Sequence, residues 1–250
     1  MTVALGVLTG RRAVVTGGAK GIGAAISRQL AEAGAKVAVW GRDEAALEAM
    51  SAEIDGVAVP CDVTSTESVE NAMRTTNELL GGIDILVANA GRAGEGIAFD
   101  TIDDELWDSV IDTNLTGVWR CIRAMVPGFK EQNRGKVIII ASVGAVTGMS
   151  RAPAYSASKA GLLGLSRSSA AALARYNVQV NAVLPGWIQT EMSAPELEDE
   201  TLRKRLEDRT LARRTATPDE VAGVCVYLAS PASDFHTGDV IRVDGGYLIA

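Results

Sequence analysis

The chain has 250 residues, of which 47% are hydrophobic and 4% aromatic, and its formal net charge is −7. This composition can form a sizeable core, and the acidic balance argues against general attraction to nucleic acid or to an anionic membrane. The N-terminal segment lacks the basic region of a secretory signal, and no uncharged apolar run reaches the roughly 18 residues of a membrane span. We therefore expect a cytoplasmic protein that binds neither nucleic acid nor a membrane.

The three cysteines, Cys61, Cys121 and Cys225, lie far apart in the sequence and form no C-x-x-C pair. An odd number of scattered cysteines is not typical of a disulfide framework or of a structural metal site. We therefore expect reduced thiols in the core and no bound metal.

Strand-like and helix-like patterns alternate along the whole chain. The predicted strands are residues 11–16, 36–41, 56–61, 83–88, 135–141, 178–184 and 239–243. The predicted helices are residues 22–33, 43–54, 65–80, 104–130, 155–175 and 218–229. This alternation predicts an α/β fold, in which βαβ units form a parallel sheet with helices on both faces. No linker divides the chain, so residues 1–250 are expected to form a single domain.

One segment, residues 187–216, fits this alternation poorly. It is highly charged and falls between a predicted strand and a predicted helix. A connection of this length inside a compact domain usually has a function of its own. We expect an inserted helical segment that acts as a lid over the substrate.

The first predicted strand runs into a glycine-rich turn with the spacing G-x-x-x-G-x-G, formed by Gly17, Gly21 and Gly23. Glycine lets the backbone approach a ligand closely, and the free N–H groups of the following helix favour an anion such as a pyrophosphate. Short glycine motifs also occur in plain strand–helix turns, which is the alternative interpretation.

The end of the second predicted strand bears on the choice of cofactor. Folds that prefer NAD usually carry an acid there to bind the ribose 2′-hydroxyl, whereas this chain has Gly41 followed by Arg42. A guanidinium can pair with the 2′-phosphate of NADP, and Lys20 in the glycine turn adds a second positive charge. Alternatively, Asp43 binds the ribose hydroxyls and Arg42 is solvated. We expect NADP(H), with NAD(H) as the alternative.

Tyr155 and Lys159 form a Y-x-x-x-K pair, and residues four apart share one face of a helix. An ammonium beside a phenol favours the phenolate and lowers the tyrosine pKa, so such a tyrosine can exchange a proton with a carbonyl or alcohol oxygen. Ser142 ends the fifth predicted strand, at the sheet edge where α/β proteins bind their ligands, and its hydroxyl can bond the same oxygen.

Taken together, these motifs resemble those of the short-chain dehydrogenase/reductase family, in particular its 3-oxoacyl-(acyl-carrier-protein) reductase-like members. The matching segments are T-G-x-x-x-G-x-G at 16–23, A-N-A-G at 88–91 in place of N-N-A-G, T-N-L-T-G around Asn114, Ser142 with Tyr155 and Lys159, P-G-x-x-x-T from Pro185 and Gly186 to Thr190, and D-G-G at 244–246. The resemblance covers essentially the whole chain.

The resemblance implies a Rossmann-type, doubly wound sheet of about seven parallel strands. It also implies an enzyme that transfers a hydride between NADPH and the carbonyl of a small ketone or aldehyde. In this family Tyr155 would be the acid/base, and Lys159 would tune it and hold the nicotinamide ribose. Ser142 would polarise the carbonyl, and Asn114 would support Lys159 through a water molecule.

The resemblance further implies that Asp62 and Val63 line an adenine pocket and that Ile188 and Thr190 contact the carboxamide end of the cofactor. Together with the motif residues, the expected cofactor-binding set is Gly17, Lys20, Gly21, Ile22, Gly23, Arg42, Asp62, Val63, Asn89, Ala90, Gly91, Tyr155, Lys159, Pro185, Gly186, Ile188 and Thr190. Family members usually assemble as tetramers through their long helices, so we expect a homotetramer joined by residues 104–130 and 155–175.

Other functions remain open at this stage. An NAD-linked sugar, polyol or secondary-alcohol dehydrogenase would use the same scaffold, and a non-catalytic NADP sensor or a structural subunit are more distant alternatives. A 3-oxoacyl thioester is one candidate substrate, although the net negative charge argues against docking of an acidic carrier protein. Arg92 and Arg151 are expected at the surface, with contact to an acidic substrate as the alternative, and His236 is expected to be structural.

Overall fold

The computed structural model describes residues 6–94 and 97–250. Residues 1–5, part of the N-terminal segment for which no secretory signal was expected, lie outside the described residues. Within the described ranges, seven parallel strands form one sheet in the order β3-β2-β1-β4-β5-β6-β7. The strands are β1 (Arg12–Thr16), β2 (Lys36–Gly41), β3 (Val57–Pro60), β4 (Ile85–Ala88), β5 (Gly135–Ile140), β6 (Val178–Pro185) and β7 (Val240–Val243).

Helices connect the strands on both sides of the sheet. The α-helices are α1 (Gly21–Glu32), α2 (Glu44–Glu53), α3 (Thr66–Leu80), α4 (Asp104–Ile111), α5 (Gly117–Glu131), α6 (Gly144–Thr147), α7 (Pro153–Leu173), α8 (Ala194–Glu198), α9 (Glu200–Arg209) and α10 (Pro218–Ala229). Short 3₁₀ or π turns are η1 (Asp112–Thr116), η2 (Ala174–Tyr176), η3 (Glu191–Ser193), η4 (Pro231–Ser233) and η5 (Tyr247–Ile249). No helix in these ranges is long and apolar enough to cross a membrane.

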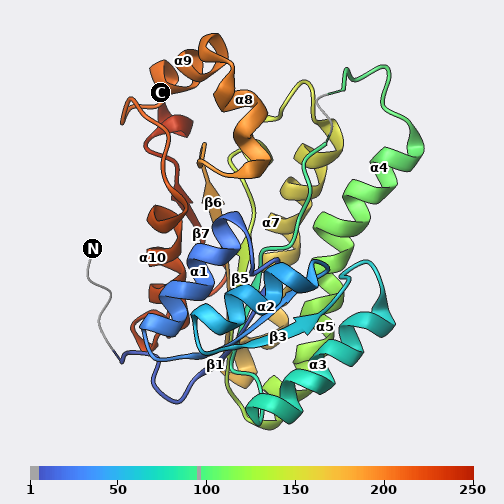
Figure 1. Cartoon of the computed structure of the whole chain (residues 1–250), viewed down its shortest axis with the longest axis vertical. Helices are drawn as coiled ribbons and strands as arrows, with labels where there is room; N and C mark the ends of the chain where they lie inside the picture. The colour runs from blue at the N-terminus through green and yellow to red at the C-terminus, as the bar shows by residue number, and fades with distance from the viewer. Residues whose placement is uncertain (1–5, 95–96) are drawn as a thin grey trace.

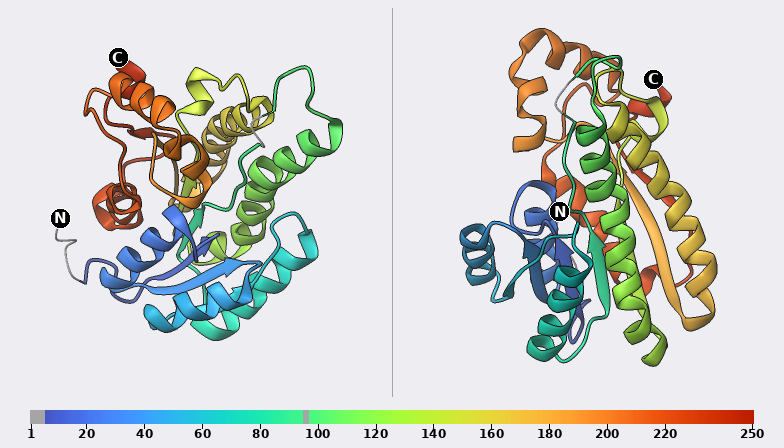
Figure 2. Two further views of the ribbon diagram at one scale, coloured as in Figure 1. Left: turned by 45° about the horizontal axis from the view of Figure 1, so that its top comes forward. Right: turned by 90° about the vertical axis from the view of Figure 1, so that its right-hand side faces the viewer.

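The sheet lies between two helical layers, with α1, α2 and α10 on one face and α3, α5 and α7 on the other (Figures 1 and 2). Successive strand residues alternate between the two cores, as the pleat requires. Val14 and Leu86 belong to the core under α3, α5 and α7, whereas Val15 and Val87 belong to the core under α1, α2 and α10. The predicted fold class, a doubly wound α/β sheet covered on both faces, is confirmed.

The strand order creates a crevice at the carboxyl edge of the sheet. From β1 the chain builds outward through β2 to β3, and it then returns to β4 and builds through β5 and β6 to β7 in the other direction. The helices that follow β1 and β4 therefore leave the sheet toward opposite faces, and ligands of such sheets bind in the gap between them. The predicted ligand-binding edge thus coincides with a topological switch point.

Two features refine the predicted elements. Side-chain caps set helix starts: Asp43 accepts from the amide of Ala46 at 3.1 Å, and Ser65 accepts from that of Ser68 at 3.2 Å. The helix predicted over residues 104–130 is not continuous: the π turn η1 separates α4 from α5. The hydrophobic periodicity of the sequence did not reveal this turn, because the residues before it and the residues after it both keep the spacing of an α-helix. The segment 187–216 contains helices α8 and α9, as expected.

Candidate active site

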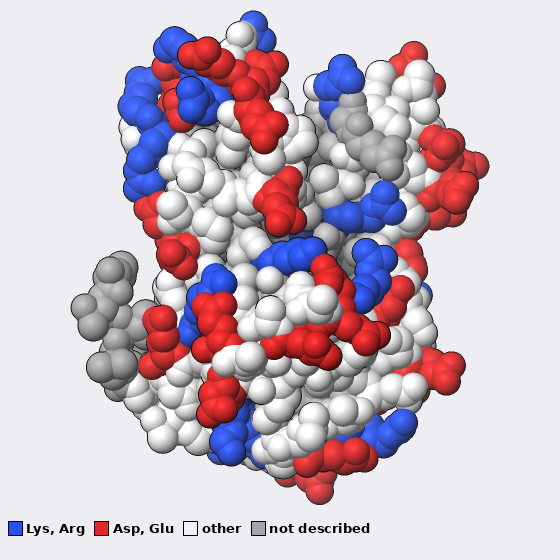
Figure 3. All heavy atoms as spheres, in the orientation of Figure 1, with Lys and Arg blue, Asp and Glu red and all other residues white. Residues whose placement is uncertain are grey.

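A pocket of about 750 Å³ opens at the carboxyl edge of the sheet, over the switch point. The space-filling view shows this side of the molecule hollowed, with Lys and Arg atoms lying among Asp and Glu atoms around the hollow (Figure 3). The predicted residues that line the pocket are Gly17, Lys20, Gly21, Ile22, Arg42, Asp62, Val63, Asn89, Ala90, Gly91 and Thr190. Four strand ends and the start of the segment 187–216 therefore meet at one cavity.

The glycine turn has a shape that other residues would not permit. Gly17 and Gly21 have φ of +62° and +52°, in the left-handed region that favours glycine. A Cβ on Gly23 would lie 2.1 Å from the carbonyl oxygen of Gly17 and 2.5 Å from Asn89 Nδ2. The first turn of α1 therefore packs directly on the loop, so that its N-terminus faces the pocket, an arrangement suited to a phosphate group.

Thr16 and Asn89 hold the glycine turn against the end of β4. The Thr16 hydroxyl accepts hydrogen bonds from the amides of Asn89 and Ala90 at 3.0 and 2.9 Å. In return, Asn89 Nδ2 donates to the carbonyl oxygens of Thr16 and Gly17 at 3.0 and 3.2 Å. Asn89 therefore both lines the pocket and braces its phosphate-binding side. Thr16, the first residue of the T-G motif, was not among the expected site residues.

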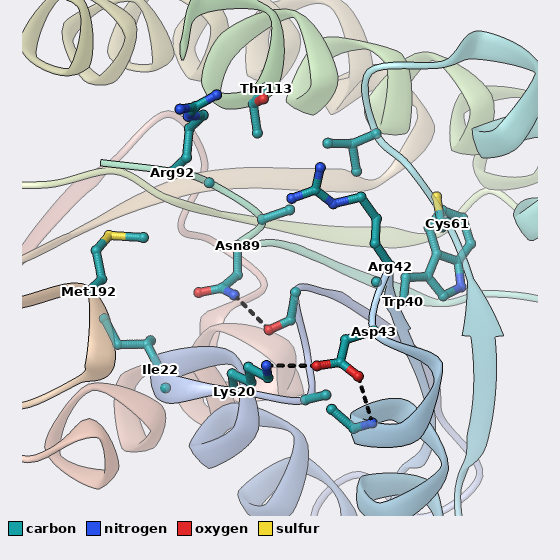
Figure 4. Close-up of a pocket in the computed structure, with 18 of the residues that line it drawn as sticks. Lys20, Ile22, Trp40, Arg42, Asp43, Cys61, Asn89, Arg92, Thr113 and Met192 are labelled. Atoms are coloured by element: carbon teal, nitrogen blue, oxygen red, sulfur yellow. Dashed lines mark hydrogen bonds and ion pairs between the residues drawn. The ribbon is translucent and has the colours of Figure 1, made fainter. Parts of the chain in front are cut away.

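Lys20 and Arg42, both expected to bind a 2′-phosphate at the end of β2, differ in their surroundings. Lys20 Nζ lies 2.7 Å from Asp43 Oδ2 (Figure 4), and this bond raises the pKa of Lys20 and lowers that of Asp43. Arg42 extends away from this pair, and its charge helps to lower the pKa of Asp62. Asp43, the alternative ribose ligand, is thus an ion-pair partner of Lys20.

Six expected cofactor residues do not line this pocket: Gly23, Pro185, Gly186 and Ile188, and also Tyr155 and Lys159, which are described below. Gly23 lies behind the glycine turn, and Ile188 is buried in the core and bridges to Ala216. Pro185 ends β6, and Gly186 donates its amide to the carbonyl of Val243 at 2.9 Å. A Cβ on Gly186 would lie 2.8 Å from the Cα of Asp244, so this glycine allows the close approach of β6 to the end of β7.

Ser142 and Tyr155 are linked by a side-chain hydrogen bond where β5 ends and α7 begins. Both residues are half-buried, and Ser142 Oγ also accepts from the amide of Gly144 at 3.0 Å. Burial raises the pKa of Tyr155, while its bond with Ser142 opposes this change. The phenol therefore carries its proton at neutral pH and can donate it to an oxygen placed beside Ser142.

Lys159 is 5% exposed, and burial lowers its pKa to about 8. Its Nζ donates to the carbonyl of Ile140 at 2.9 Å and lies 5.6 Å from the centre of the Tyr155 ring. The expected effect of Lys159, a lowered pKa of Tyr155, is therefore absent: the ammonium bonds the end of β5 rather than the phenol oxygen, and burial of the phenol dominates. The two side chains nevertheless share one face of α7, as their spacing predicted.

Asn114 is fully buried in the π turn η1. Its Oδ1 accepts from the amide of Arg92 at 2.8 Å, and its Nδ2 donates to the carbonyl of Arg92 at 2.9 Å and to Ser158 Oγ at 3.2 Å. The turn between α4 and α5 thus ties the loop after β4 to α7. π turns occur frequently at functional sites, where the extra residue redirects a side chain.

Gly91 connects the pocket with these polar side chains. It lines the pocket, and a Cβ at this position would lie 3.3 Å from Asn114 Oδ1 and 3.5 Å from Lys159 Nζ. Asn114 and Lys159 therefore lie directly behind Gly91, and Tyr155, which bonds Ser142, lies near Lys159. Gly91 is thus the lining residue through which the pocket adjoins this polar cluster, although Asn114, Ser142, Tyr155 and Lys159 do not themselves line the pocket.

Several pocket residues lie outside the expected cofactor-binding set. Cys61 follows β3 directly and lines the pocket, with a pKa raised to about 12 by burial, so its thiol stays protonated at neutral pH. Arg92, expected at the surface, is half-buried and lines the pocket, where its Nη1 donates to Ser109 Oγ at 3.0 Å. Met192 lines it from the segment 187–216. The positions of Cys61 and Arg92 shortly after strand ends could have indicated that they reach the pocket, since the carboxyl ends of parallel strands lie at one edge of the sheet.

Two further residues match the expectation for residues outside the site. Arg151 is exposed, on the turn before α7. His236 Nδ1 lies 2.7 Å from Asp239 Oδ2 in the loop that precedes β7. Loops that precede parallel strands lie at the amino edge of the sheet, opposite the pocket. Cys61, Cys121 and Cys225 are buried free thiols, as predicted.

Comparison with known proteins gives matches over nearly the whole chain. A family model described as Enoyl-(Acyl carrier protein) reductase matches residues 17–248. The 3-oxoacyl-(acyl-carrier-protein) reductase FabG of Vibrio harveyi is 36% identical over 241 residues, covering 96% of this chain and 98% of the relative. The 5-keto-D-gluconate 5-reductase of Escherichia coli is 36% identical over 248 residues, covering 97% of each chain.

Solved structures agree with these sequence matches. A gluconate 5-dehydrogenase from Burkholderia cenocepacia, solved in complex with NADP and tartrate, has a TM-score of 0.94 at 33% identity, with 97% of both chains covered. Levodione reductase has a TM-score of 0.93 at 30% identity, covering 97% of this chain and 99% of that chain. The similarity in fold therefore extends over nearly the whole chain.

Proposed function

The chain belongs to the short-chain dehydrogenase/reductase family of oxidoreductases, and on that premise we propose that it transfers a hydride between NADP(H) and the carbonyl of a small ketone or aldehyde. One observation carries this proposal: Gly91, which lines the pocket, lies against Asn114 and Lys159, and Lys159 lies near Tyr155, which bonds Ser142. The printed names of the relatives describe 3-oxoacyl and 5-keto substrates, which share a ketone.

The pocket fits a dinucleotide. Its volume of about 750 Å³ lies within the range of about 300–1,000 Å³ usual for ligand and cofactor sites. The glycine turn offers backbone N–H groups at the N-terminus of α1, and Asp62 and Val63 would border the adenine. NADP(H) would supply or accept the hydride when bound. The residues proposed to hold its nicotinamide end are Asn89, Ala90, Gly91 and Thr190 from the pocket lining, together with Tyr155, Lys159, Pro185, Gly186 and Ile188, which lie outside that lining.

The polar side chains would then handle the substrate oxygen. Ser142 would donate a hydrogen bond to the carbonyl oxygen and hold it beside Tyr155. Tyr155, whose raised pKa keeps the phenol protonated, would deliver its proton as negative charge develops on that oxygen. Lys159 would bond the nicotinamide ribose, and Asn114 would keep the loop at Gly91 and helix α7 in register. Oxidation of an alcohol would follow the same contacts in reverse.

The cofactor preference can be tested at Arg42, which is exposed at the end of β2 and lines the pocket. Arg42→Ala should raise the KM for NADPH about 10-fold or more and leave that for NADH nearly unchanged, because a charge-assisted bond to the 2′-phosphate is worth about 1.5–3 kcal/mol. Steady-state kinetics with both cofactors and a panel of ketones measure this. Arg74→Ala, on the exposed face of α3, is the matched control, and a wild type that prefers NADH would refute the assignment.

We also propose that residues 187–216 form a lid on the single domain formed by residues 1–250. Thr190, Glu191 and Met192 line the pocket from this segment, and a Cβ on Gly21 would lie 3.4 Å from Thr190 Cγ2. The start of the segment thus already touches the glycine turn. Leu206 of α9 packs with Tyr247 of η5, which anchors the far end of the segment to the C-terminal turn.

The protein is further proposed to form a homotetramer through the faces of α4, α5 and α7. Trp107 on α4 and Trp119 on α5 are 37% and 42% exposed, and large apolar side chains on adjacent helices are typical of an interface. Sedimentation at micromolar concentration should give four times the chain mass of 26.1 kDa. Trp119→Glu should lower that mass, whereas Leu79→Glu on α3 should leave it unchanged; a monomeric wild type would contradict the assignment.

A further inference from the structure

The pocket contains equal numbers of positive and negative side chains among its described lining residues. The cations are Lys20, Arg42 and Arg92, and the carboxylates are Asp43, Asp62 and Glu191. A pocket that binds a cofactor through an extra phosphate benefits from excess positive charge. The arrangement of these charges, rather than their sum, therefore decides how well a 2′-phosphate is bound.

Asp43 occupies a position that suits an anion from a ligand. Its Oδ2 lies 2.7 Å from Lys20 Nζ, and its Oδ1 accepts from the amide of Ala46 in the first turn of α2 at 3.1 Å. An ammonium together with a free amide at a helix N-terminus is a common phosphate-binding arrangement. The carboxylate of Asp43 thus uses two donors that a phosphate at the end of β2 would otherwise attract.

We propose that Asp43 is a specificity-determining residue that competes with the 2′-phosphate of NADP(H) for Lys20, and that it thereby moderates the preference for NADP(H) over NAD(H). This inference rests on the proposed function, because it requires a dinucleotide in this pocket. Arg42 extends away from the pair and supplies a positive charge that Asp43 does not bind (Figure 4). Before a cofactor binds, Lys20 in this pocket is therefore already paired with the carboxylate of Asp43.

The ion pair is exposed enough to be exchanged. The Lys20 and Asp43 side chains are 56% and 52% exposed, so the pair contributes little to stability and can open when a ligand arrives. NADPH would have to break this bond and would face the charge of Asp43 nearby. NADH has no 2′-phosphate to offer Lys20, so its binding would leave the pair intact.

The test is the affinity for both cofactors, measured by calorimetry on the full-length protein without substrate. Asp43→Asn is the informative variant, because asparagine caps a helix as well as aspartate does and so preserves the start of α2. The expected result is an NADPH affinity about three- to tenfold higher than in the wild type, as for removal of one exposed charge, with the NADH affinity unchanged.

Glu53→Gln is the matched control. Glu53 pairs with Arg28 at 2.5 Å, so this variant also removes one carboxylate that joins α1 to α2, but it does so away from the pocket lining. It should leave both affinities unchanged. An equal gain in NADPH affinity in this control would mean that net charge alone is responsible, which would overturn the role of Asp43.

A double variant separates competition for Lys20 from simple repulsion. In a Lys20→Met background, Asp43→Asn should give less than half of its single-variant gain in NADPH affinity. An undiminished gain, or no gain in the wild-type background, would overturn the inference. A loss of NADH affinity on Asp43→Asn would also overturn it, because Asp43 would then be a ribose ligand. A wild-type protein that bound neither cofactor would instead refute the proposed function itself.

Discussion

Replacing Tyr155 by phenylalanine should lower kcat by about 10²–10⁴-fold, the range typical for loss of a general acid. The change keeps the ring and removes the proton. Burial raises the pKa of this phenol, so at neutral pH it holds the proton that the carbonyl oxygen needs. His236 cannot replace it, since it pairs with Asp239 in a loop at the opposite edge of the sheet. Cofactor affinity should be nearly unchanged, because the glycine turn and Arg42 are untouched.

The control for this variant is Tyr176→Phe. Tyr176 lies in η2, at the far end of α7, where its hydroxyl accepts from Arg175 Nη2 at 2.5 Å. The same loss of a hydroxyl there should leave kcat within about twofold of the wild type, as expected for a surface substitution. A Tyr155→Phe enzyme that kept most of its kcat would rule out the proposed proton transfer, whichever ketone is used.

Lys159→Ala should damage both catalysis and cofactor binding, which distinguishes it from Tyr155→Phe. Loss of a charge-assisted bond to the nicotinamide ribose should raise the cofactor KM about 10- to 100-fold, and kcat should fall about 10²-fold or more. Lys36→Ala, at the exposed start of β2, is the control. A variant with normal cofactor KM would show that Lys159 does not hold the ribose. Circular dichroism and the Tm verify that the variant is folded.

The pH dependence gives Lys159 a separate signature. Its pKa of about 8 in the folded protein lies below the usual value of 10.5, so its positive charge is present below pH 8 and is lost above it. Cofactor affinity in the wild type should therefore fall as pH rises through about 8, and this step should vanish in Lys159→Ala. Between pH 8 and 10.5 the unfolded chain binds the extra proton, so the wild-type free energy of unfolding should rise over this window relative to the variant.

The sequence by itself was enough to predict the fold class and the residues of the two local motifs. Alternating strand and helix patterns predict a parallel sheet with two helical layers, because each pattern depends only on neighbouring residues. Gly17, Gly21 and Gly23 require a tight turn, and Tyr155 and Lys159 require one helix face, for the same reason. The resemblance to a known family placed Ser142 and Asn114 at positions that the structure brings close to Tyr155 and Lys159.

Only the tertiary structure decided how these side chains are paired and charged. The bond from Lys20 to Asp43 and the contact of Lys159 with Ile140 each join residues from different secondary-structure elements. Arg92 is half-buried because the loop after β4 packs against other elements. The π turn that carries Asn114 is likewise compatible with the periodicity of an ordinary helix. Charge partners and burial set pKa values and ligand preference, and both depend on distances that appear only when the strands and helices are assembled.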